Sequence, residues 1–96
     1  MKTENDKNYN ENMYESLLQT SEWQQRREEI LRRDGYRCRV CNSSDNLQVH
    51  HRQYHYDTQH DSFKKPWEYD DANLITLCES CHKKGHELYK IPVFYI

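Results

Sequence analysis

The stretch that decides the fold is Cys78-Glu-Ser-Cys-His-Lys-Lys-Gly-His86, where a histidine directly follows the second cysteine of a Cys-x-x-Cys pair. A matching pair, Cys38 and Cys41, lies upstream. Two such turns can complete a tetrahedral four-sulfur zinc site with no open position. The alternative is two buried thiol pairs or a redox motif, but a redox motif is not expected to be duplicated. We therefore predict a structural Zn²⁺ bound by Cys38, Cys41, Cys78 and Cys81.

Composition favours one small domain that needs such a metal. The chain has 96 residues, of which 34% are hydrophobic, so it can bury only a modest core. Small cores often depend on a metal or on disulfides. No apolar run is long enough for a membrane span or a signal peptide, so we expect a cytoplasmic protein without a membrane partner. In that compartment paired cysteines favour metal over disulfides.

Charge is unevenly distributed, although the net charge of −2 gives no general argument for nucleic acid. Residues 1–22 hold two lysines and five acidic residues, whereas residues 23–39 hold six arginines and three acidic residues. The basic segment is either a solvated helix face with Glu–Arg pairs or a face that contacts phosphates. The sequence leaves both open. The arginines are Arg26, Arg27, Arg32, Arg33, Arg37 and Arg39.

Hydrophobic periodicity predicts a short helix around Tyr14, Leu17 and Leu18, two longer helices and two short strands. Residues 1–12 hold no aliphatic residue after Met1 and are expected to form a flexible tail, so the domain would occupy residues 13–96. A helix with one apolar stripe should begin after Thr20 or Ser21 and end at Asp34-Gly35. Strands are expected at residues 47–50 and 74–77, and a second helix at residues 79–90. The predicted core comprises Trp23, Ile30, Leu31, Leu47, Val49, Leu74, Ile75 and Leu77.

The remaining segments carry weaker patterns. Residues 52–72 form a long connection, of the kind that is usually functional, disordered or partly helical. Residues 91–96 are expected to be extended. Trp67 and Tyr69 can either cover the small core or stack on a nucleobase. His55 and His60 are expected on the loop surface.

Histidines are expected to form a second, open site. If a metal closes both cysteine turns, the two strands come together and the second helix leaves from the same metal. His82 and His86 then share one helix face and can meet the strand end that carries His50 and His51. Adjacent residues of a regular strand point to opposite faces. The two strand histidines can therefore serve one site only if the strand ends or twists there.

These motifs resemble the HNH nucleases, also called His-Me finger or ββα-metal nucleases. The resemblance rests on His50-His51, on Asn73-Leu-Ile-Thr-Leu-Cys-x-x-Cys-His-x-x-x-His86 and on the lead-in from Trp23 to Cys41. Pro66-Trp-Glu-Tyr69 is similar to a loop of bacterial members. The resemblance covers about Trp23 to Glu87. It implies an α+β fold, a small ββα-metal domain with an N-terminal helix and four-cysteine zinc knuckles. It also implies a metal-dependent endonuclease acting on DNA.

Carried over residue by residue, the resemblance implies specific roles. His51 would be the general base, and His50 and His82 would bind the catalytic divalent ion. His86 matches a third ligand found in only some members, and many members carry Asp where this chain has His50. Asn73 would hold the loop and the base in position. Imidazole ligands suit Zn²⁺, Ni²⁺ or Mn²⁺ as well as Mg²⁺.

Two other function classes compete with a nuclease. A zinc-stabilised nucleic-acid-binding module would share the cysteine site but leave the histidine site inert. A zinc deaminase needs a His-x-Glu motif before Pro-Cys-x-x-Cys. Neither His50-His51-Arg52 nor Leu77-Cys78 supplies that motif. The binding module therefore stays as the alternative.

Overall fold

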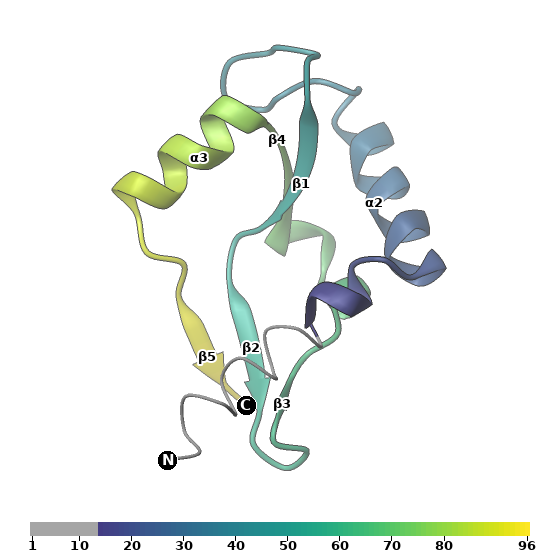
Figure 1. Ribbon diagram of the computed structural model, residues 1–96, viewed down its shortest axis with the longest axis vertical. Helices are drawn as coiled ribbons and strands as arrows, with labels where there is room; N and C mark the ends of the chain where they lie inside the picture. Colours follow the sequence, from purple (N-terminus) through teal and green to yellow (C-terminus); the bar gives the residue numbers. More distant parts are fainter. Residues whose placement is uncertain (1–13) are drawn as a thin grey trace.

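The computed structural model describes residues 14–96, so the tail predicted at residues 1–12 lies outside the described part. Residues 14–17 are helical. The elements that follow are α2 (Ser21–Arg33), β1 (Leu47–His51), β2 (Tyr54–Asp57), β3 (Ser62–Phe63), the 3-10 turns η1 (Pro66–Glu68) and η2 (Asp71–Asn73), β4 (Leu74–Cys78), α3 (Glu79–Leu88) and β5 (Val93–Tyr95) (Figure 1). No helix among the described residues is long and apolar enough to cross a bilayer.

Helix α2 begins and ends where its capping residues predict. The Thr20 hydroxyl accepts a hydrogen bond from the Trp23 amide at 3.3 Å, which satisfies one of the free N–H groups of the first turn. At the other end Gly35 has a φ of 69°, a left-handed conformation that glycine adopts without strain. The apolar stripe buries Trp23, Ile30 and Leu31. The predicted helix is therefore confirmed, including its core face.

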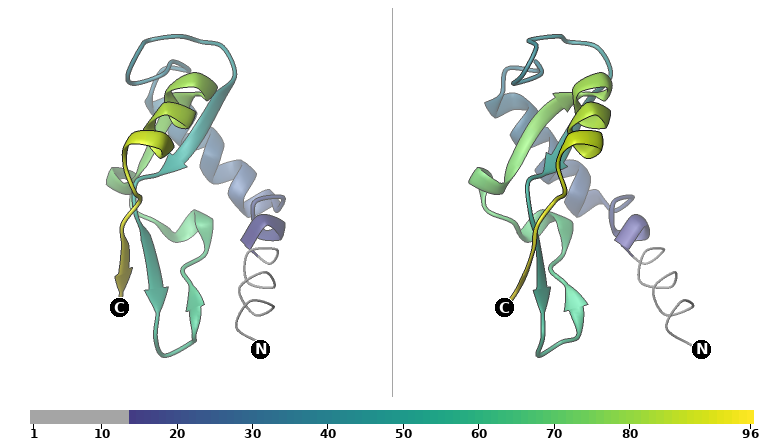
Figure 2. Two further views of the ribbon diagram at one scale, coloured as in Figure 1. Left: turned by 60° about the vertical axis from the view of Figure 1, so that its left-hand side comes forward. Right: turned by 90° about the vertical axis from the view of Figure 1, so that its left-hand side faces the viewer.

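The central unit is an antiparallel pair of strands between two helices. β1 pairs with β4 from Leu47 opposite Cys78 to His51 opposite Leu74. The helices α2 and α3 lie on opposite faces of this pair (Figures 1 and 2). β1, β4 and α3 form the ββα unit, and α2 supplies the second wall. The resulting fold is a small mixed helix-and-sheet domain, as the sequence predicted.

The hydrophobic core around the β1–β4 pair is divided into two clusters. One contains the buried residues Trp23, Ile30, Tyr69 and Leu74, with Val49 and Trp67 packed against it. The second contains Cys38, Leu77 and Cys78, with Leu47 and Ile75 alongside. Tyr69 is only 2% exposed and Trp67 is half-buried, so the Pro-Trp-Glu-Tyr segment covers the core. Because cysteines belong to the second cluster, its packing depends directly on the knuckles.

The long connection after β1 contains strands that the sequence analysis did not predict. β2 and β3 form a hairpin in which Tyr56 pairs with Phe63, and Asp61 in its turn has a φ of 52°. β5 then pairs in parallel with β2, Tyr54 opposite Val93. The predicted extended segment at residues 91–96 is thus a sheet edge. Its strand residues are all exposed, so β5 adds little to the core.

A buried carboxylate ties the end of α2 to the first knuckle and to β4. Asp34 is 8% exposed and accepts hydrogen bonds from Arg33 at 2.9 Å, Arg39 at 2.9 Å and the Thr76 amide at 3.0 Å. Burial of the carboxylate raises its pKa, but these donors outweigh that effect and hold the Asp34 pKa below its usual range. The ionised carboxylate therefore joins three segments.

Replacing Asp34 with asparagine is expected to lower the free energy of unfolding by about 1.5–3 kcal/mol at pH 7, the range for hydrogen bonds to charged groups. Because the pKa of Asp34 is depressed by folding, its stabilisation is complete above the unfolded-state pKa of about 3.9 and is lost as pH falls below it. Denaturant titrations should show the gap between wild type and variant narrowing below about pH 4. The exposed carboxylate Asp45, replaced by asparagine, is the control. Equal stabilities of the Asp34 variant and wild type at pH 7 would contradict this role.

Candidate metal centres and active site

The four cysteines converge at the junction of the knuckle, β4 and α3. Cys38 and Cys41 lie in the turn after α2, Cys78 ends β4, and Cys81 lies in the first turn of α3. Their sulfur atoms all lie within 4.8 Å of one another, and those of Cys41 and Cys78 are 3.6 Å apart. Zn–S bonds of about 2.3 Å at tetrahedral angles place sulfurs about 3.8 Å apart. The cluster can therefore hold a structural metal ion, with dimensions that suit zinc.

Backbone amides prepare these thiols to bind a cation. The Val40 amide donates to the Cys38 sulfur and the Cys81 amide to the Cys78 sulfur, each at 3.4 Å. Although burial disfavours a charged Cys38, hydrogen bonds from the amides of Cys41, Cys78 and Val40 lower its pKa to about 6. The thiolate is the form that binds metals, so these amides favour ligation through Cys38.

Three histidines form a second cluster, which we call the histidine trio: His50 on β1, and His82 and His86 on α3. Their ring nitrogens lie within 4.8 Å of one another, and the two Nε2 atoms on α3 are 2.9 Å apart. Two nitrogens bound at about 2.1 Å and at right angles around one ion would be about 3.0 Å apart. The trio therefore has the spacing of ligands to a single divalent ion.

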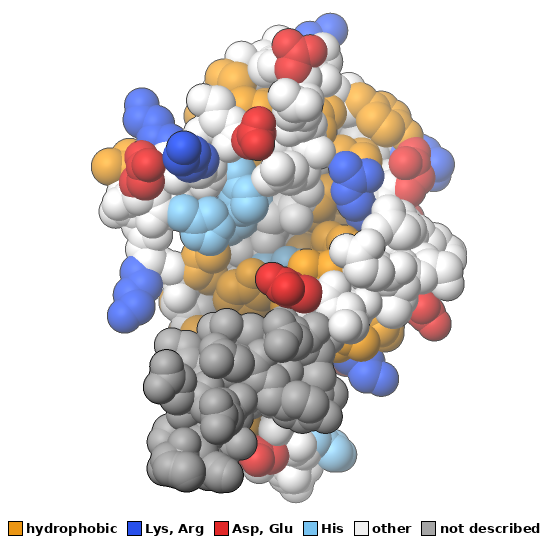
Figure 3. Space-filling view, viewed as in Figure 1, with side chains coloured by type: hydrophobic (Ala, Val, Ile, Leu, Met, Phe, Trp, Pro, Cys, Tyr) orange, Lys and Arg blue, Asp and Glu red, His pale blue; other side chains and the backbone are white. Residues whose placement is uncertain are grey.

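The histidine trio is open to solvent. His50 and His82 are half-buried and His86 is exposed. Histidine side chains are visible on the molecular face of Figure 3, with Lys or Arg side chains nearby. Burial, followed by the neighbouring His82 and His86, lowers the pKa of His50 to about 4. At neutral pH His50 is therefore the uncharged imidazole that metal binding requires.

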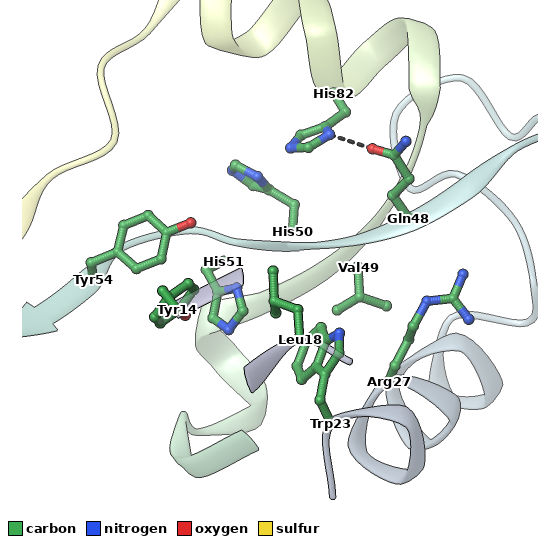
Figure 4. Close-up of a pocket in the computed structure, with 10 residues that line it drawn as sticks. All are labelled: Tyr14, Leu18, Trp23, Arg27, Gln48, Val49, His50, His51, Tyr54 and His82. Carbon is green, nitrogen blue, oxygen red and sulfur yellow. Dashed lines mark hydrogen bonds between the residues drawn. The ribbon is translucent and has the colours of Figure 1, made fainter. Parts of the chain in front are cut away.

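Gln48 orients the trio, a role that the sequence analysis missed. Its side-chain oxygen pairs with Nδ1 of His82 (Figure 4). Because that oxygen only accepts, Nδ1 carries the proton and Nε2 is left free to bind a metal. Gln48 precedes His50 by two residues, and side chains two apart on a strand share a face. The alternation of side chains along β1 was the sequence signal that could have identified Gln48 as a neighbour of the histidine trio.

Replacing Gln48 with leucine is expected to weaken divalent-ion binding at the histidine trio by about 10–100-fold, the usual effect of losing such an outer partner. Replacement by glutamate keeps an acceptor for His82 and should preserve most of the affinity. Calorimetric titration of Ni²⁺ into zinc-loaded protein measures both variants, with leucine at the exposed Gln59 as a control. Unchanged Ni²⁺ affinity in the leucine variant would remove Gln48 from the metal site.

A cavity of about 250 Å³ runs along the unpaired edge of β1. It reaches residues on both faces of the strand and on both flanking helices, so it must pass around the edge that β4 leaves free. The lining residues are Tyr14, Leu18, Trp23, Arg27, Gln48, Val49, His50, His51, Tyr54 and His82 (Figure 4). Two members of the histidine trio thus share a solvent-connected space with α2.

Comparison with known families gives one match, and it covers both metal clusters. The HNH endonuclease family model matches residues 38–88, more than half of the chain. The chain belongs to the HNH endonuclease family. Searches of curated proteins and of solved structures found no match. Membership points to nuclease or other nucleic-acid-related activity, and HNH nucleases use divalent metals, for which the trio is the open candidate site.

His51, expected as the general base of an HNH site, is not brought to the trio. His50 and His51 point to opposite sides of β1 (Figure 4), as the period of a strand requires. His51 is 4% exposed, and its ring stacks on Trp23 at 5.1 Å and on Tyr54 at 5.5 Å between centroids. The two histidines could serve one site only if the strand ended or twisted there. β1 does end at His51, but the alternation of the strand holds through its last two residues.

A backbone carbonyl fixes the protonation of His51. Nε2 lies 3.0 Å from the carbonyl oxygen of Pro66. Because a carbonyl only accepts, Nε2 carries the proton and Nδ1 keeps its lone pair. Burial lowers the pKa of His51, against a smaller opposing effect from that carbonyl. His51 is therefore a neutral imidazole that lines the cavity next to His50.

Asn73 closes the end of the β1–β4 pair. Its backbone carbonyl accepts a hydrogen bond at 2.8 Å from the amide of Arg52, the residue after His51. This contact fixes the chain where it leaves the strand. The other two histidines lie outside the cavity lining, and His55, expected on a loop surface, lies half-buried in β2. His60 is exposed and bonded to Asp57 at 2.7 Å, and the half-buried His55 contacts Gln53 at 2.6 Å.

Proposed function

We propose that the protein is a metal-dependent endonuclease that hydrolyses phosphodiester bonds in DNA. The observation that carries the proposal is the convergence of three imidazoles, from β1 and α3, within 4.8 Å of one another beside an open cavity in an HNH chain. His50, His82 and His86 would hold a divalent ion, either Mg²⁺, Mn²⁺, Ni²⁺ or Zn²⁺. The four cysteines would hold a separate structural Zn²⁺.

The residues of the chain have distinct tasks in this proposal. His50, His82 and His86 would hold a divalent ion, which would supply Lewis-acid stabilisation of the charge that develops on the phosphoryl oxygens. Gln48 keeps His82 in the tautomer that binds. The exposed lysines Lys83 and Lys84 on α3 lie between the two helix histidines in the sequence and add positive charge for a polyanion.

His51 is proposed as the general base that takes a proton from the attacking water. It lines the same cavity as His50 and His82, and its Nε2 proton is engaged by Pro66. Nδ1 then has the free lone pair that a base needs, on an imidazole that is neutral at pH 7. Asn73 is proposed as a positioning residue, because its carbonyl holds the amide next to His51.

A nucleic-acid-binding module without catalysis is the second candidate. The observation that favours it is the burial of His51, whose ring packs among aromatic side chains of the core. If His51 serves only in packing, the site has no general base, and the trio would bind a metal ion without catalysing hydrolysis. The two candidates differ in one outcome, which is whether a phosphodiester bond is broken.

Plasmid cleavage tests the proposal. The full chain, freed of loosely bound ions by brief EDTA treatment, is incubated with supercoiled DNA and then with Mg²⁺, Mn²⁺ or Ni²⁺. We expect nicking only after an ion is added, loss of nicking when His82 is replaced by alanine, and wild-type nicking when the exposed His60 is replaced. DNA binding without cutting under every ion would establish the second candidate instead.

A further inference from the structure

The cavity along β1 has the charge of an anion site. Among the ten lining residues, Arg27 carries the only permanent charge, and none is Asp or Glu. The trio likewise consists of imidazoles and contains no carboxylate. A cavity lined by one arginine and by no carboxylate favours the binding of a negatively charged group from solvent.

Among the arginines of residues 23–39, only Arg27 and Arg37 lack an ion pair in the described part of the chain, and only Arg27 lines the cavity. Within residues 14–96 no carboxylate lies within ion-pair distance of Arg27. Four of the others form ion pairs: Arg26 with Asp71 and Glu29, Arg32 with Glu28, and Arg33 and Arg39 with Asp34. Arg37, like Arg27, donates to a backbone carbonyl, but it lies outside the cavity lining. Of the six arginines that the sequence offered as possible phosphate contacts, Arg27 is therefore the candidate that the structure favours.

We propose that Arg27 binds a backbone phosphate of the DNA strand that enters this cavity, and so positions the strand at the histidine trio. This inference deepens the proposed nuclease function and rests on it. His50, His82 and Arg27 line the same cavity, so one strand can contact both Arg27 and the trio. Phosphate contacts fix the register of a protein on DNA without reading sequence.

The guanidinium of Arg27 is already held in place. It is half-buried, and its Nη2 atom donates to the carbonyl oxygen of Leu47 at 3.1 Å. Figure 4 shows Arg27 extending from α2 towards β1, on the same side of the strand as Val49 and Trp23. One bond to Leu47 leaves other N–H groups of the planar fork to donate to a phosphate. Because the side chain is fixed beforehand, little conformational entropy remains to be lost on binding.

A salt titration of DNA binding tests this assignment. Anisotropy of a labelled duplex is measured with the full chain in EDTA, so that binding is read without cutting. Replacing Arg27 with glutamine should lower the slope of log affinity against log salt by about 0.9, the value for one lost phosphate contact. Arg27→Lys should restore the slope but only part of the affinity, because an ammonium lacks the fork. Arg32→Gln, the same change at a 70% exposed side chain on the same helix, should alter the slope far less.

Cleavage kinetics supply a second reading. A strand anchor acts on bound substrate and transition state alike, so Arg27→Gln should raise KM with little change in kcat. If wild type binds and cuts DNA, but Arg27→Gln and Arg32→Gln match it in salt slope and KM, the assignment of Arg27 is wrong and the proposed function stands. If wild type neither binds nor cuts DNA, the proposed function fails, and the role of Arg27 fails with it.

Discussion

Replacing Cys38 with serine is expected to unfold the domain rather than to weaken it slightly. Binding free energy at a structural zinc, about 10–16 kcal/mol in small zinc domains, is also folding free energy. Here the cysteines form part of the packing, because Cys38 and Cys78 are 2% and 6% exposed and share a cluster with Leu77. Circular dichroism melts and zinc content measure the effect, and Cys81→Ser should behave in the same way.

The matched control for this change lies in the same knuckle. Val40 is 70% exposed, so its replacement by serine leaves the cysteine cluster intact and should preserve the cooperative melt. A Cys38→Ser protein that melts cooperatively at the wild-type temperature would contradict a structural metal at this site. Wild-type melting that stays unchanged after the last metal has been removed would contradict it equally.

Replacing His51 with glutamine is expected to reduce DNA cleavage by about 10²–10⁴-fold, the usual contribution of a general base. Glutamine is chosen because His51 is buried and stacked on Trp23 and Tyr54, so alanine would open a cavity in the core. The glutamine amide can still donate to the Pro66 carbonyl. Single-turnover cleavage and thermal melting are measured on the same preparation.

Two comparisons make the His51 result interpretable. His60→Gln changes the same residue type on the exposed hairpin and should leave the cleavage rate unchanged. Metal binding at the histidine trio should also be unchanged in His51→Gln, because His51 points to the other side of β1. A His51→Gln protein that cuts at the wild-type rate would exclude His51 from the chemistry and leave it a packing role.

Local patterns predicted the parts of the fold that depend on neighbouring residues. The apolar stripe from Trp23 to Leu31 and the caps at Thr20 and Gly35 define α2 without reference to the rest of the chain. Cysteine spacing predicted the cluster that joins the knuckle to α3. The interval of four between His82 and His86 placed both on one helix face, where the structure adds His50.

Features that depend on distant pairing were not visible in the sequence. Strand β2 is stabilised by β3 and by the parallel edge strand β5, and its residues are only half-buried, so it lacks the apolar run that marks a core strand. The role of Asp34 likewise depends on Thr76, which lies 42 positions away. His51 was expected to lie beside His50, but the alternation of strand residues turns its side chain to the opposite face of β1. There its ring packs between Trp23 and Tyr54.

The central claim is that the chain carries one closed structural metal site and one open catalytic site. Mass spectrometry of the intact protein before and after brief EDTA treatment tests it most directly, with plasmid cleavage followed on the same samples. We predict a folded, inactive protein that retains one zinc. Four thiolates leave no open position, whereas the histidine trio includes the exposed His86 and borders an open cavity. Adding back Mn²⁺ should restore cutting. If activity and the last zinc disappear together, the division into two sites is wrong.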